Sequence, residues 1–171
     1  KVCTKFHCKF VHISTDYVFE GTNCQPYKET DTVCPQSAYG RTKLQGEQLI
    51  QTSCGESLII RTSWLYSTFG NNFVKTMIKL GTERDELKVV FDQVGTPTYA
   101  GDLAKAILTI ISKVENNTKS FVAGVYHFSN EGVCSWYDFT KEIHSIAHIE
   151  CSVIPEESKN YPSPAKRPFY S

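Results

Sequence analysis

The sequence predicts an α/β fold with a largely parallel β-sheet. Short apolar runs that suit buried strands alternate along the chain with longer segments whose apolar residues recur at helical spacing. This alternation is typical of sheets whose parallel strands are joined by crossover helices. No internal repeat or low-complexity tract interrupts the 171 residues, and no clean linker divides them, so we expect a single unit over 1–171.

The first part of the chain is predicted to form a strand, a long loop, a helix and a second strand, in that order. The first strand, KFVHI, ends in the polar cluster Ser14-Thr15-Asp16. The loop that follows contains glycine and two prolines without any sustained period. Ser37 suits the N-cap of the helix. The bounds expected are 9–13 for the first strand, 17–35 for the loop, 38–52 for the helix and 57–63 for the second strand.

The rest of the chain continues the alternation. Helices are expected over 72–81, 100–114 and 135–149, and strands over 87–91, 125–129 and 151–154. The middle one of these helices carries Leu103, Ile107 and Ile111 at helical spacing, and Ser135 suits the N-cap of the last. The segment 92–98 (DQVGTPT) is predicted to be a turn that shapes a pocket. The tail after residue 154 contains four prolines and no period.

Composition argues against several classes of partner. Lys plus Arg and Asp plus Glu both number 18, and this balance gives no support to sequence-independent binding of DNA, RNA or an acidic membrane. No apolar run approaches the roughly 20 residues needed to cross a bilayer, and we expect no signal peptide. Seven irregularly spaced cysteines without a Cys-x-x-Cys pair indicate free thiols in a reducing cytoplasm.

One pair of histidines has a spacing that can bind metal. His144 and His148 lie one helical turn apart. There is no Glu between them in the zincin arrangement and no third ligand in view. We therefore expect a surface pair and no metal site.

The segment Tyr39-Gly40-Arg41-Thr42-Lys43 opens the first predicted helix. A spacing of four places Tyr39 and Lys43 on one helix face. A phenol has a pKa near 10 in water, and a nearby ammonium lowers it, which makes a tyrosine usable as a general acid or base at neutral pH. On its own the pair also suits an exposed helix that merely contains both residues.

A second motif precedes this helix. Ser14-Thr15-Asp16-Tyr17-Val18-Phe19 follows an apolar strand directly, which is where α/β sheets bind their ligands. A hydroxyl at this place can donate to a substrate carbonyl oxygen and stabilise the charge that develops during reduction. A strand end, a long loop and a helix with Tyr-x-x-x-Lys occur in the order of a short-chain dehydrogenase/reductase active site.

Four linked segments make the resemblance more specific. STDYVFEG, SAYGRTKLQGEQ, IIRTSWLYSTFGNNFVKTMI and FDQVGTPTYAGDLA closely resemble the dTDP-4-dehydrorhamnose reductases, an extended short-chain dehydrogenase/reductase family, and the tail YPSPAKRP resembles that family's late segment. The resemblance covers about residues 9–168. It implies a partial Rossmann-like parallel sheet with a small C-terminal substrate-binding lobe, so that the second half of the dinucleotide-binding fold is interleaved with this lobe.

The resemblance also implies roles for individual residues. Tyr39 would donate the proton to the C4 oxygen of a dTDP-4-dehydro-6-deoxy sugar, and the product would be dTDP-L-rhamnose. Lys43 would lower the pKa of Tyr39, and Tyr39 and Lys43 would contact the cofactor, NADPH or NADH, which supplies the hydride. Thr15 would bind the keto oxygen, and Thr15, Asp16 and Trp64 would contact the sugar nucleotide. Arg167 suits either a contact with the pyrophosphate or a solvated position in the tail, and both remain open.

The chain departs from the family in its glycines. The family holds the cofactor's pyrophosphate with a glycine-rich turn near its N-terminus, whereas the ten glycines here form no Gly-x-x-Gly-x-x-Gly or Gly-x-Gly-x-x-Gly after a strand. We therefore expect a fragment without this part. It should bind NADPH poorly, be inactive alone, and expose an unpaired sheet edge through which it self-associates or forms a homo-oligomer.

Two other functions remain as alternatives. One is a non-catalytic regulatory subunit similar to that of methionine adenosyltransferase, which shares the scaffold and a similar Tyr-x-x-x-Lys helix. The other is a related sugar-nucleotide epimerase or dehydratase. The RTSWLY and GNNF segments favour the reductase, since they resemble its sugar-binding side.

Overall fold

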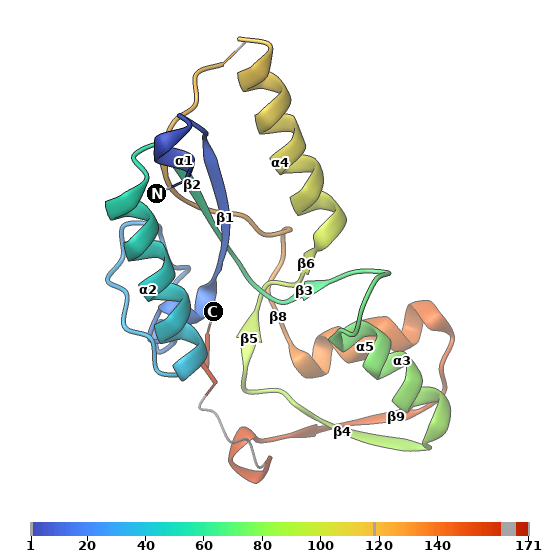
Figure 1. Ribbon diagram of the computed structural model, residues 1–171. Coiled ribbons are helices and arrows are strands. Elements are labelled where there is room, and N and C mark those ends of the chain that lie inside the picture. The colour runs from blue at the N-terminus through green and yellow to red at the C-terminus, as the bar shows by residue number, and fades with distance from the viewer. Residues whose placement is uncertain (1, 118, 162–166, 171) are drawn as a thin grey trace.

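A computed structural model of the protein describes residues 2–117, 119–161 and 167–170, which form two lobes (Figure 1). The helices are α1 (Val2–Lys5), α2 (Ala38–Ser53), α3 (Phe73–Glu83), α4 (Ala100–Glu115) and α5 (Trp136–Ala147), with the 3-10 helices η1 (Asp16–Val18) and η2 (Ser158–Asn160). The strands are β1 (Phe10–Thr15), β2 (Ser57–Thr62), β3 (Leu65–Tyr66), β4 (Glu86–Val90), β5 (Val94–Gly95), β6 (Thr98–Tyr99), β7 (Gly124–His127), β8 (Cys134–Ser135) and β9 (Ser152–Glu156). The predicted alternation of strands and helices is confirmed.

The first lobe is built on a three-stranded parallel sheet in the order β1-β2-β7. Successive side chains of a strand point to opposite faces of its sheet. Leu58 and Ile60 of β2 pack with Leu103 of α4 on one face, and Arg61 meets Glu47 of α2 on the other. The helices α2 and α4 therefore cover opposite faces of the sheet (Figure 1).

Both outer strands of this sheet, β1 and β7, pair with β2 alone among the described residues. The unpaired edge that the sequence predicts is thus present, and self-association through it stays a prediction.

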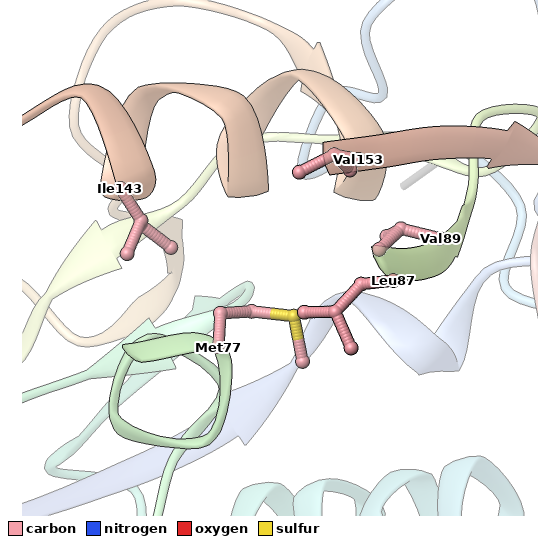
Figure 2. Packing of buried hydrophobic residues seen from close by; sticks show 5 residues of the cluster. All are labelled: Met77, Leu87, Val89, Ile143 and Val153. Carbon is pink, nitrogen blue, oxygen red and sulfur yellow. The ribbon is translucent and has the colours of Figure 1, made fainter. Parts of the chain in front are cut away.

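The second lobe packs α3 and α5 against the parallel pair β4-β9. Its apolar core lies between these helices and strands, and Figure 2 shows the side chains facing one another. They are Met77, Leu87, Val89, Ile143 and Val153. The prediction of a C-terminal lobe was incomplete, because α3 and β4 come from the middle of the chain and only α5 and β9 from its end. The parallel pairing of β4 with β9 brings the two segments together.

Two predicted boundaries near the candidate site were wrong. β1 extends to Thr15, so that Ser14 and Thr15 are buried within the strand and do not follow it. The turn expected over 92–98 contains β5, which pairs with β8 in the antiparallel sense, and it ends on the first residue of β6. Both strands of the β5-β8 pair have two residues, too short for a period to reveal them.

The prediction that His144 lies at the surface was wrong. The residue is 4% exposed, and its Nε2 lies 3.0 Å from the carbonyl oxygen of Met77 on α3. The ring fits because Gly81 carries no side chain at this point; a Cβ there would approach Nε2 to 2.5 Å. His148 is exposed at the C-cap of α5. Within the described ranges, no group of three or more His, Cys, Asp or Glu side chains could hold a metal ion.

The end of the chain returns to the first lobe. Residues 162–166 of the predicted tail lie outside the described residues. After them, the backbone N–H of Val94 donates to Phe169 (2.8 Å), and the N–H of Tyr170 donates to Gly21 in the loop after β1 (3.0 Å). The tail therefore joins this loop to β5. All seven cysteines are free thiols, and none of the helices in the described ranges has the length and apolar character needed to span a bilayer.

Candidate active site

The tip of β1 holds the first predicted catalytic residue. Thr15 is 5% exposed, and its Oγ1 accepts a hydrogen bond from the backbone N–H of Tyr17 (3.2 Å). The same hydroxyl donates to Oδ1 of Asp16 (2.9 Å). Thr15 thus caps η1, and the position of its hydroxyl is fixed at the carboxyl end of the strand.

The start of α2 holds the second predicted catalytic residue, Tyr39. Ser37 caps the helix as predicted, since its Oγ accepts a hydrogen bond from the N–H of Gly40 (3.0 Å). Gly40 packs so closely on η1 that a Cβ would lie 2.2 Å from the carbonyl oxygen of Tyr17. Tyr39 is 55% exposed, and its ring meets the ring of Tyr17 edge to face, with centroids 5.7 Å apart. The phenol of Tyr39 therefore lies beside the segment that follows Thr15.

Lys43 ties this helix to the strand. Its Nζ donates to the backbone carbonyl of Ile13 in β1 (2.6 Å), two residues before Thr15. Burial lowers the pKa of His12, which lies on β1, and the Lys43 ammonium lowers it further. Lys43 thus contacts β1 at Ile13, and Tyr39 contacts Tyr17, whose N–H is bound by Thr15, so all three residues lie near the carboxyl end of β1.

A buried ion pair that the sequence analysis missed lies on the same face of α2. Glu47 follows Lys43 by four residues and is 1% exposed. Its Oε2 accepts from Nη2 of Arg61 (2.7 Å) and its Oε1 from Nε of Arg61 (3.0 Å). An arginine within the buried strand SLIIRT was the available signal, because a buried charge requires a partner.

Trp64 lies beyond the end of β2, on the side of the second lobe. Its ring stacks on Trp136 of α5 with centroids 3.4 Å apart, and its backbone has φ +48°. This left-handed conformation is rare for a bulky residue and is held by tight packing against Gly95, where a Cβ would come within 2.6 Å of the indole. The structure therefore places Trp64 between the lobes and records no contact between it and Tyr39.

A small cavity of about 130 Å³ opens at the carboxyl ends of the three strands of the first lobe. Asp16, the first residue after β1, lines it together with Thr62 at the end of β2 and His127 at the end of β7. Burial lowers the pKa of His127, and the Glu29 carboxylate opposes this effect. Ligands of parallel α/β sheets bind at this edge.

A larger cavity of about 600 Å³ lies between α3, β4, η2 and the tail. Phe73, Met77 and Trp136 form part of its apolar wall, and Lys88 and Arg167 add positive charge. Asp92 and Gln93 also line it, as predicted for the 92–98 segment. Asp92 accepts hydrogen bonds from the N–H and the hydroxyl of Ser158, which fixes η2 beside the cavity.

Arg167 lines the larger cavity and is exposed. Burial and the Asp16 carboxylate raise the pKa of Tyr17, whereas the Arg167 guanidinium acts to lower it. Arg167 thus has an electrostatic effect on Tyr17, whose ring packs on the ring of Tyr39. The sequence alone leaves open whether Arg167 contacts the pyrophosphate or is solvated in the tail.

The residues present fit one end of a nicotinamide dinucleotide. The ammonium of Lys43 and the hydroxyl of Tyr39 are donors that suit the nicotinamide ribose. The diphosphate needs an open helix N-terminus, and three helices, α2, α3 and α5, are capped by their own Ser37, Asn72 and Ser135. The helix α4 has no side-chain cap but carries Asp102 in its first turn, which would repel a phosphate.

The parallel sheet, the threonine at a strand tip and the helix with Tyr39 and Lys43 together define a fold of the short-chain dehydrogenase/reductase type. A model of the RmlD substrate binding domain family matches residues 1–171. The chain belongs to this family, that of the dTDP-4-dehydrorhamnose reductases.

Individual proteins agree with the family match. A spore coat polysaccharide biosynthesis protein, SpsK, of Bacillus subtilis (strain 168) is 44% identical over 98% of this chain and 56% of its own length. A crystal structure of a dTDP-4-dehydrorhamnose reductase from Clostridium acetobutylicum ATCC 824 is 49% identical with a TM-score of 0.91, over 99% of this chain and 57% of its own. The reductase of Bacillus anthracis str. Ames, crystallised in complex with NADP, is 43% identical with a TM-score of 0.90, over the same shares. The chain thus spans little more than half the length of these proteins.

Proposed function

We propose that this chain supplies the proton-donating and substrate-binding half of an enzyme that reduces the C4 keto group of a dTDP-4-dehydro-6-deoxy-L-sugar to give dTDP-L-rhamnose. The observation that carries the proposal is the position of Tyr39 and Lys43 on α2, next to the tip of β1 where Thr15 is fixed. A proton donor, a cation and a hydroxyl at one edge of a sheet suit the reduction of a carbonyl group.

The reaction adds a hydride to the C4 carbon and a proton to the C4 oxygen. NADPH or NADH, when bound, supplies the hydride. Tyr39 donates the proton, because the residue is 55% exposed at the start of α2 and a ketone can approach it. The ammonium of Lys43 lies on the same helix face. There it would donate to the ribose of the cofactor and stabilise the phenolate that remains on Tyr39.

Thr15 and Asp16 act on the same keto oxygen and on the sugar. The Thr15 hydroxyl donates to Asp16 in this structure. To bind the substrate, it would exchange this partner for the keto oxygen, and the Asp16 carboxylate would then be available to accept from a sugar hydroxyl. The N–H of Tyr17 keeps the Thr15 oxygen in place during the exchange.

The larger cavity suits the thymidine diphosphate part of the substrate. Its size lies within the range of small-molecule sites. Phe73 and Trp136 offer aromatic surface to a base, and Lys88 and Arg167 offer cations to the diphosphate. Trp64 stacks on Trp136 and so supports the wall of this cavity, which gives it an indirect role in substrate binding.

The proposal is tested with Tyr39→Phe, which removes the proton donor and keeps the ring. Oxidation of NADPH by dTDP-4-dehydro-6-deoxy-L-sugar is measured for two proteins. One is the chain alone, and the other, the joined form, is the chain fused to the part of a relative's sequence that the chain does not cover. We expect activity in the joined form, and a loss of about 100-fold or more in kcat in the Tyr39→Phe variant. The matched control is Tyr126→Phe on β7, which removes a tyrosine hydroxyl that donates to the backbone carbonyl of Val122. Full activity of Tyr39→Phe would overturn the assignment.

A further inference from the structure

Tyr17 contacts both halves of the candidate site. Its backbone N–H donates to Oγ1 of Thr15 (3.2 Å). Its carbonyl oxygen lies against the first turn of α2, where the backbone of Gly40 leaves no room for a Cβ. Its ring meets the ring of Tyr39 at an interplanar angle of 76°. One residue therefore connects the strand tip with the helix that carries the proton donor.

The orientation of the Tyr39 phenol depends on this packing. Tyr39 is more than half exposed, and no hydrogen bond holds its hydroxyl within the part of the chain that the structure describes. An edge-to-face arrangement is a favoured geometry for two aromatic rings, since the positive edge of one meets the negative face of the other. Tyr17 is itself half-buried, and its backbone is held by Thr15 and by the first turn of α2, so its ring is the more restrained of the two.

We propose that Tyr17 is a positioning residue that holds the phenol of Tyr39 at a fixed distance from the Thr15 hydroxyl. The inference rests on the proposed reduction, because a fixed distance between the two hydroxyls matters only if both bind the ketone oxygen. The ketone oxygen must meet both hydroxyls at once. A ring that turns freely would satisfy this requirement for only part of the time, and misplacement of a reacting group lowers the rate steeply.

The test compares Tyr17→Phe, which keeps the ring, with Tyr17→Leu, which removes the aromatic edge. In the active joined form, we expect Tyr17→Leu to lower kcat by about 10- to 100-fold while KM for the sugar nucleotide stays within about twofold. Tyr17→Phe should keep kcat within about threefold of the original protein. Tyr126→Leu is the matched control, because it removes a partly exposed tyrosine ring from the other face of the first lobe.

A second measurement needs no activity. The aromatic resonances of Tyr39 in the chain itself are expected to shift in Tyr17→Leu, which loses the ring current of the neighbour, and to stay close to their original positions in Tyr17→Phe. The inference is overturned if Leu and Phe give the same kcat, or if Tyr126→Leu lowers kcat as much as Tyr17→Leu does. If the original joined form does not reduce the sugar nucleotide, the proposed function fails. Unchanged Tyr39 resonances in Tyr17→Leu would show separately that Tyr17 does not position the phenol.

Discussion

Arg61 of β2 and Glu47 of α2 form a buried ion pair with bidentate geometry. Nη2 of Arg61 lies 2.7 Å from Oε2 of Glu47, and the two side chains are 6% and 2% exposed. The Arg61 guanidinium also lies over the ring of Phe19, 5.1 Å from its centroid. Glu47, Lys43 and Tyr39 follow one another at intervals of four residues, so one face of α2 carries all three. The ion pair fixes this face on the sheet two helical turns from Tyr39.

Removal of one partner should destabilise the protein strongly. Glu47→Ala leaves the Arg61 charge buried without a counter-ion, and we expect the free energy of unfolding to fall by about 3–5 kcal/mol. The double variant Glu47→Leu/Arg61→Met replaces the pair with apolar side chains and should recover most of the loss. Urea unfolding of the three proteins measures both effects. A double variant no more stable than Glu47→Ala would contradict this account.

The same helix shows how far the sequence could predict the site. The cap at Ser37 and the spacing of Tyr39 and Lys43 are local features, and the structure has the cap and places both side chains beside β1. The inner face of α2 was not predictable from apolar periodicity, because its buried residues are Gly40 and Glu47, and Leu49 is 61% exposed. A helix held by an ion pair and a close backbone contact carries little hydrophobic signal.

Long-range pairing was the other limit. The parallel pair β4-β9 joins residues from 86 onward to residues from 152 onward, and no local pattern specifies this partner. The placement of the tail that carries Arg167 likewise depends on the bonds of Phe169 to Val94 and of Tyr170 to Gly21. The family resemblance supplied the candidate catalytic residues, but the lobe boundary and the place of Arg167 required the structure.

Gly40 should be intolerant of even a methyl group. In Gly40→Ala, the Cβ would meet the backbone carbonyl oxygen of Tyr17 at 2.2 Å and the ring of Pro35 at 2.9 Å. A backbone atom cannot move aside cheaply, so we expect a loss of about 1–3 kcal/mol in the free energy of unfolding. Gly46→Ala is the matched control on the same helix, since its Cβ would have only the His12 ring nearby, at 3.9 Å.

The two glycine variants should differ in sign. Alanine favours a helix over glycine by about 0.5–1 kcal/mol, so Gly46→Ala should raise the melting temperature while Gly40→Ala lowers it. Thermal unfolding followed by circular dichroism measures both. Equal shifts in the two variants would show that α2 does not press on Tyr17 in solution.

Acidification should weaken the first lobe through two histidines. Burial lowers the pKa of His12 and of His127 below the ordinary value of 6.5; Lys43 adds to the effect at His12, and Glu29 opposes it at His127. Because the unfolded chain then binds protons that the folded chain does not, the free energy of unfolding falls as the pH drops through about 6.5 toward the folded pKa values. Above that pH the folded state keeps its full stability.

This pH window separates the histidines from the carboxyl groups. The pKa values of Glu29 and Asp138 are lowered by hydrogen bonds, so these groups cost stability only below their ordinary values of 4.5 and 3.8. Urea unfolding at about pH 7.5 and about pH 5.5 should show the loss. His12→Gln and His127→Gln should each reduce the difference between the two pH values. A difference that is unchanged in both variants would assign the pH dependence to other groups.

The larger cavity should bind dTDP in the chain itself, because Phe73, Trp136, Lys88 and Arg167 all belong to it. Binding should quench the fluorescence of Trp136, and calorimetry gives the Kd independently. Arg167→Ala removes a guanidinium that suits the diphosphate, and a hydrogen bond to a charged group contributes about 1.5–3 kcal/mol, so the Kd should rise about 10- to 100-fold. Lys88→Ala should weaken binding less, because the ammonium is also paired with Glu156 at 3.8 Å.

Arg84→Ala is the control for charge, since Arg84 is exposed at the C-cap of α3 and does not line the cavity. It lowers the net charge of the chain by the same amount as Arg167→Ala, so a general electrostatic attraction would affect both variants equally. If Arg167 contacts the diphosphate, only Arg167→Ala should raise the Kd. High salt should then weaken the binding of dTDP by the original chain, because it screens this contact. Equal Kd values for the two arginine variants would place dTDP elsewhere on the molecule, because Arg167 is the arginine that lines the cavity among the described residues.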